Sequence, residues 1–296
     1  MKNQFSAAVL LLLMVVFAAS AAAQKEKSKD DLFKEIAKLT NSKKTEDLDK
    51  AYSMAKEFVT RFAADKDPRV TNTKAFIGKY RQNLFVNAVV AKKTTDTFAL
   101  GREILAEEPD NTGVVINLAY MGYTARESGD KAYETDAVTF ARKSVELLEA
   151  GKLPQSFAPY KDQGETSGWM HFIIGFLSFE KDAKTAAEEA YKAVQFETPI
   201  KNDPLPYYMI ASYYEDLYTK FSTAKTEPAK TEKAIDLMLD AYARTCKRAE
   251  VTKNPGNTQW KERLAQIYKF RKKTDAGLAD FIAATDSMPL ADPAKF

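Results

Sequence analysis

The chain has little of the chemistry on which most enzymes depend. Its 296 residues include one histidine, His171, and one cysteine, Cys246. One cysteine excludes an intrachain disulfide, and one residue of each type excludes a zinc site made from histidine and cysteine pairs. The sequence also has no G-x-S-x-G elbow, no Walker loop and no G-x-G-x-x-G turn. We therefore expect a protein that is not an enzyme and that holds no metal ion or cofactor.

The single histidine and the single cysteine are both expected to have structural roles. His171 lies in the aromatic helical stretch SGWMHFIIGF, which favours a packed and hydrogen-bonded side chain over a catalytic base. Cys246 lies in the helical stretch AYARTCKRAE, where a buried small residue is the expected role. The acidic pairs Glu107–Glu108 and Glu188–Glu189 stand among lysines, as on solvated helix surfaces. A glycosidase can work with two carboxylates alone, but no pair is singled out here.

Neither sign of charge dominates. There are 44 Lys and Arg residues against 41 Asp and Glu, a net charge of +3. This balance gives no field that would attract a polyanion, so we expect no nucleic-acid partner.

Long apolar runs are absent except at the start, MKNQFSAAVLLLLMVVFAASAAAQ. One early positive charge, Lys2, precedes an uncharged run from Ala7 to Ala19, and small residues follow it. The alternative, a retained membrane anchor, needs a run of about 20 residues. We expect residues 1–23 to be a signal peptide cleaved after Ala23, which places residues 24–296 in the periplasm or outside the cell without a stable membrane span.

Strand signals are also scarce, because no Asn-Gly or Asp-Gly turn occurs and alternating runs are few. Apolar residues instead recur at three- and four-residue spacing, which predicts an all-α chain. Prolines and glycines separate the segments. The predicted helices span 30–40, 46–63, 69–92, 94–108, 111–127, 133–150, 165–180, 183–197, 204–221, 229–250, 257–272 and 274–287. We expect one continuous domain over 24–296, in which the 151–165 segment is the place for a hinge.

Two windows of the sequence share one pattern of spacing. Each has a small residue, a second small residue twelve positions later, an aromatic four after that and a proline eight later still. The residues are Gly175, Ala187, Tyr191 and Pro199 in the first window, and Ala265, Gly277, Phe281 and Pro289 in the second. Weaker copies surround Leu118, with Ala119, and Ile210, with Ala211 and Tyr214. The spacing predicts a repeated helical hairpin, and the alternative is an unrelated all-α domain.

On these residues the chain resembles the tetratricopeptide repeat family, whose helix–turn–helix unit of about 34 residues has small residues at the helix crossing, an aromatic and a closing proline. The resemblance covers roughly 80–290 and implies a right-handed α-solenoid of antiparallel helix pairs. It also implies a concave groove, lined by the first helix of each pair, that binds a protein or peptide. The arginine and asparagine clamps with which some members hold C-terminal carboxylates are not recognisable.

The implied groove is aromatic in its middle and polar toward the C-terminus. Its expected binding residues are Tyr120, Tyr123, Trp169, Phe172, Phe176, Tyr208 and Glu215. Tyrosine and tryptophan give a large contact area at low entropic cost, which suits a recognition surface. Two alternatives stay open. The aromatics are core residues if the inserted segments fold back over them, and exposed Trp and Tyr would equally suit binding of a glycan or the cell wall.

Overall fold

The computed structural model describes residues 27–42, 44–225 and 227–296, and over these ranges every regular element is helical. The all-α prediction is therefore confirmed for the described chain. The expected signal peptide and its cleavage site after Ala23 lie outside these residues. None of the described helices has the length and apolar character needed to cross a membrane.

Most predicted helices begin and end within a few residues of the observed ones. The α-helices are α2 (Lys29–Thr40), α3 (Thr45–Arg61), α4 (Pro68–Val90), α5 (Thr94–Glu107), α6 (Thr112–Glu127), α7 (Glu134–Glu149), α8 (Gln163–Ser178), α9 (Ala183–Ala193), α10 (Pro204–Ala224), α11 (Pro228–Val251), α12 (Asn257–Lys272) and α13 (Leu278–Ala284). Three 3-10 turns are η1 (Pro199–Asn202), η2 (Thr285–Ser287) and η3 (Pro293–Lys295). Side chains that cap helix starts explain several boundaries, as when Asp203 accepts the Leu205 amide at 2.8 Å.

The chain divides into two compact units, Met1–Asn83 and Leu84–Phe296, and the division falls inside α4. In the first unit α2 packs on α3 around the buried side chains of Leu32, Ile36 and Phe58. Phe33 and Phe58 rings stand 6.0 Å apart in this core. This unit contains none of the predicted site residues.

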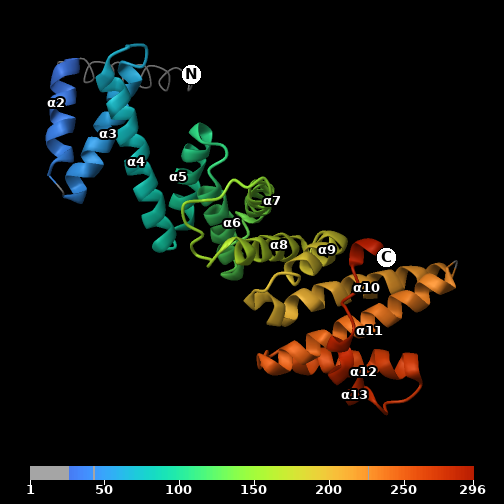
Figure 1. Ribbon diagram of the computed structural model, residues 1–296. Coiled ribbons are helices and arrows are strands. Elements are labelled where there is room, and N and C mark those ends of the chain that lie inside the picture. The colour runs from blue at the N-terminus through green and yellow to red at the C-terminus, as the bar shows by residue number, and fades with distance from the viewer. Residues whose placement is uncertain (1–26, 43, 226) are drawn as a thin grey trace, which may run out of the picture. The chain divides into compact units, whose positions relative to one another are not determined.

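The second unit holds α5 to α13, and from α5 to α12 each helix packs on the next one in sequence (Figure 1). Helices that are two apart in sequence also touch: α6 contacts α8, and α8 contacts α10. Such nearest-neighbour packing is what a chain of stacked helical hairpins requires.

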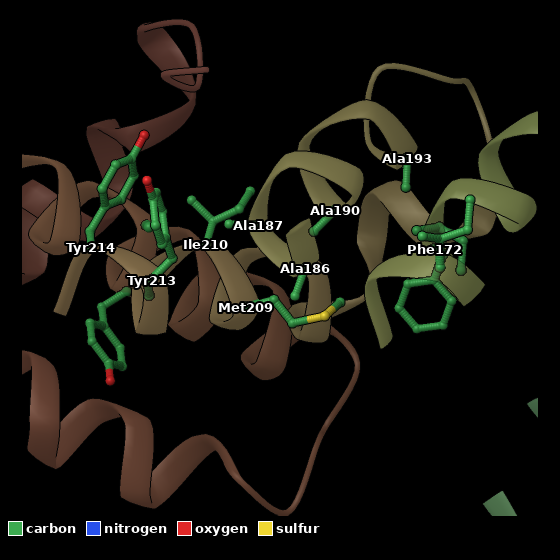
Figure 2. Close-up of a cluster of buried hydrophobic side chains, with 14 of the residues drawn as sticks. Phe172, Ala186, Ala187, Ala190, Ala193, Met209, Ile210, Tyr213 and Tyr214 are labelled. Atoms are coloured by element: carbon green, nitrogen blue, oxygen red, sulfur yellow. The ribbon is translucent and has the colours of Figure 1, made fainter. Parts of the chain in front are cut away.

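The largest core of the second unit depends on small residues of α9. Ala186, Ala187, Ala190 and Ala193 are fully buried, and Figure 2 shows Ala186 and Ala187 beside Met209 and Ile210 of α10 and Ala193 on the side of Phe172. Gly175 of α8 lies directly against the backbone of α9, since a Cβ at this position would lie 3.0 Å from the Ala186 carbonyl oxygen. Small residues therefore let α8 and α9 approach closely, as the spacing around Gly175 and Ala187 predicted.

The second half of this window differs from the prediction. α9 ends at Ala193, whereas the sequence predicted an end at 197. Tyr191, the predicted aromatic of the window, lies within α9 and is half-buried. The Phe196 ring stacks on His171 at 5.9 Å, and the Thr198 side chain lies against Gly168, where an added Cβ would be 2.9 Å from its methyl carbon. These contacts take the chain out of the helical path before Pro199, which begins η1 instead of closing α9.

The C-terminal window departs further. The helix predicted over 274–287 begins only at Leu278, because Gly277 has φ +84 and forms the turn ahead of it. Gly277 is exposed, so it is not the crossing residue expected opposite Ala265, which is half-buried. Phe281 does pack, with its ring 5.5 Å from that of Tyr268, while Pro289 is exposed beyond η2.

Candidate functional site

Two of the expected binding residues belong to the core. Phe172 is 2% exposed and Tyr123 is 8% exposed, and their rings stand 5.9 Å apart. The Tyr123 hydroxyl donates to Glu127 Oε1 at 2.6 Å, and burial together with this bond raises its pKa. In this conformation both side chains serve packing, which is the alternative that the sequence left open.

The segment between α7 and α8 covers part of the expected surface. Its Tyr160 ring stacks on Trp169 at 5.8 Å and meets Tyr120 edge-on at 6.1 Å. Asn117 donates to the Ala158 carbonyl oxygen at 3.4 Å and so ties this segment to α6. Tyr120 and Trp169 remain half-buried beneath it. The inserted segment thus fills the α6 end of the surface.

Four half-buried aromatic side chains from α8, from the residue that caps α8 and from α10 form a surface that begins beneath this cover, at Trp169, and continues past it. We call Trp169, Phe176, Phe179 and Tyr208 the aromatic surface. Phe176 contacts the Tyr123 ring at 5.4 Å, and Phe179 meets Tyr208 edge-on at 5.8 Å. Since these rings rest on core residues, their orientation is fixed before any partner arrives.

A pocket of about 320 Å³ lies where α10, α11 and α12 meet. We call it the α10–α12 pocket. Its aromatic wall consists of Tyr208, Tyr242 and Trp260, and its other lining residues are Glu215, Gln259, Glu262, Arg263 and Gln266. Of the expected site residues, the structure brings Tyr208 and Glu215 together here.

Hydrogen bonds hold the polar side of the pocket in place. The buried Tyr242 donates its hydroxyl to Glu215 Oε2 at 2.6 Å, and Arg263 pairs with the other carboxylate oxygen. Arg263 also donates to Gln266 Oε1 at 3.3 Å. Burial, reinforced by the bond to Glu215, raises the pKa of Tyr242, so its hydroxyl stays protonated at neutral pH.

Two ring pairs align the helices that border the pocket. Tyr208 lies 5.4 Å from Trp260, and Tyr218 lies 6.3 Å from Phe270. Both pairs have the same offset in sequence, so α10 and α12 run in the same direction here. The sequence analysis did not select Trp260, Tyr242 or Arg263. Trp260 could have been found as one of only two tryptophans, whereas nothing in the sequence placed Tyr242, on α11, at this surface.

The single histidine forms a buried pair. His171 Nδ1 lies 2.6 Å from Glu189 Oε2, and Lys192 donates to the other oxygen at 2.7 Å. Both His171 and Glu189 are 8% exposed. Burial alone would raise the pKa of Glu189, but the bonds from His171 and Lys192 outweigh it and the pKa lies below its usual range.

We expect the Glu189→Gln variant to lose about 1–3 kcal/mol of unfolding free energy at pH 7, as for a hydrogen bond to a charged group. A carboxylate whose pKa is depressed on folding stabilises above its unfolded pKa of about 4.3, and this contribution is lost as pH falls through the folded value. Urea unfolding of both proteins should therefore give a difference that narrows as the pH falls below about 4, where Glu189 becomes protonated. A difference that widens in acid would contradict this role.

Cys246 lies in the core, and the acidic side chains of the described residues form no metal cluster. Cys246 is fully buried, and burial raises the pKa of its thiol to about 12. Among the described residues no three His, Cys, Asp or Glu side chains are grouped as a metal ion requires. Comparison of the chain with protein-family models, with curated proteins and with solved structures gives no match.

Proposed function

We propose that this chain is a non-enzymatic interaction protein of the tetratricopeptide-like class. In this proposal the second unit is a right-handed α-solenoid of antiparallel helix pairs. The packing of α6 on α8 and of α8 on α10 supports it, as does the common direction of α10 and α12. After cleavage behind Ala23 it would act in the periplasm or outside the cell.

The observation that carries the proposal is the half-buried aromatic surface on α8 and α10, whose rings are partly exposed to solvent. Aromatic rings with fixed orientations are the usual energetic centres of protein interfaces. The chain itself contains an example of such a contact, since the Tyr160 ring stacks on the Trp169 ring of this surface. We propose that a partner protein inserts an apolar or aromatic side chain beside Phe176 and Phe179 in the same manner.

Replacing both Phe176 and Phe179 with alanine is expected to weaken partner capture by about thirtyfold or more, since truncation of such central residues costs 2 kcal/mol or more. Capture is measured by pull-down from an envelope extract, with the retained proteins identified and titrated. Phe270→Ala is the matched control, because Phe270 is 56% exposed and lies outside the aromatic surface. Undiminished capture by the double variant, with helical circular dichroism intact, would refute the proposal.

A further inference from the structure

The α10–α12 pocket differs in chemistry from the aromatic surface. Every one of its lining side chains carries a hydrogen-bonding group, and three of these side chains also present a ring. At about 320 Å³ its volume falls at the lower end of the ~300–1,000 Å³ range of small-molecule sites. It therefore suits a small ligand with many hydroxyl or amide groups and one apolar face.

Glu215, Arg263 and Gln266 are ordered without a ligand. Glu215 uses one carboxylate oxygen for Tyr242 and the other for Arg263, so its charge is matched within the protein. Gln266 accepts from Arg263 through its oxygen, which leaves its amide N–H groups available as donors. Preorganised groups of this kind bind without the cost of ordering flexible side chains.

The aromatic wall supplies the apolar contact. Tyr208 and Trp260 are half-buried, and their rings are 5.4 Å apart at an angle of 38°. The negative face of an aromatic ring attracts the polarised C–H groups of a sugar ring. Side-chain amides and carboxylates at the rim of such a wall match the hydroxyls at the edge of the sugar.

From these contacts we infer that the α10–α12 pocket binds a saccharide unit, with the sugar ring against Trp260 and Tyr208 and its hydroxyls on Gln259, Glu262 and Gln266. The ligand carries no negative charge. Glu215 matches the charge of Arg263, so this ion pair attracts no anion. Glu262, which has no ion-pair partner among the described residues, repels a uronic acid. This inference goes beyond the proposed protein capture and does not depend on it.

The test uses tryptophan fluorescence of the purified chain. Trp169→Phe leaves Trp260 as the sole tryptophan, because the sequence has two. Titration with the neutral disaccharides N,N′-diacetylchitobiose and maltose should give a saturable change in Trp260 emission for at least one sugar at millimolar concentrations. Gln266→Ala and Glu262→Ala, made in the same background, should each weaken that binding by about tenfold, as the loss of one hydrogen bond predicts.

Controls separate this inference from the proposed function. Gln155→Ala, at an exposed glutamine outside the pocket, and Phe176→Ala, whose ring contacts Tyr123 and Phe172 and no ring of the pocket, should both bind the sugar as well as the parent does. The inference is overturned if neither disaccharide gives a saturable change, or if Gln266→Ala and Glu262→Ala bind unchanged. It is also overturned if an arginine-rich peptide saturates the emission change while both sugars leave it flat.

Discussion

Replacing Phe172 with alanine is expected to cost about 3–5 kcal/mol of unfolding free energy, the usual range for removing a buried phenyl ring. Phe172 is 2% exposed, and its ring touches those of Tyr123, Trp169 and Phe176 at 5.7–5.9 Å. The cavity left behind would lie between α6 and α8, which are in contact. Urea unfolding followed by circular dichroism measures the loss.

Phe176→Ala is the matched control, because Phe176 lies one helical turn further along α8 and is half-buried. Its loss of stability should be clearly smaller than that of Phe172→Ala. Equal losses would mean that Phe176 is a core residue and is not available to a partner. A negligible loss for Phe172→Ala would mean that this ring is free, as a binding residue would be.

Replacing Arg244 with methionine is expected to cost a similar amount, about 3–5 kcal/mol, because it leaves the half-buried Asp240 carboxylate and two carbonyl oxygens without their buried partner. Arg244 is 5% exposed and pairs with Asp240 at 2.9 Å. It also donates to the Thr285 carbonyl oxygen at 2.6 Å and to that of Met288 at 2.7 Å. The variant should therefore loosen the chain after α13, which Arg248 and Lys247 still hold to α11 through Asp286. Limited proteolysis should cut near these residues faster than in the parent.

Arg271→Met provides the comparison, since Arg271 also pairs with carboxylates, Asp236 and Glu232, but at the surface. Exposed ion pairs contribute about 0–1 kcal/mol. The account of Arg244 is wrong if the two variants unfold at the same urea concentration, or if residues 285–288 stay protected from protease in Arg244→Met.

Helix positions could be predicted well where local signals agreed with packing. The segment predicted over 204–221 is the helix Pro204–Ala224, which begins at a proline behind its Asp203 cap. The prediction was wrong at the end of α9 because tertiary contacts decided it. Phe196 stacks on His171, and no local signal shows that contact. Gly277 matched the repeat by its spacing, but the structure places it in a turn with a positive φ angle and not at a helix crossing.

The site was partly predictable for the same reason. Helical periodicity placed Tyr208 and Glu215 on one face of α10, and the structure brings both to the α10–α12 pocket. Periodicity does not say how deep a face lies, so Phe172 and Phe176 appeared equivalent although one is buried. Nor does it show which loop returns to cover a surface, as the segment that carries Tyr160 does.

Photo-crosslinking in intact cells tests the central claim, recognition of a protein through the aromatic surface, most directly. A photoreactive phenylalanine analogue placed at Phe179 should form a discrete adduct with one partner protein. The same analogue at Val251, a side chain 73% exposed outside that surface, should not. No adduct from position 179, or the same adducts from both positions, would contradict the account.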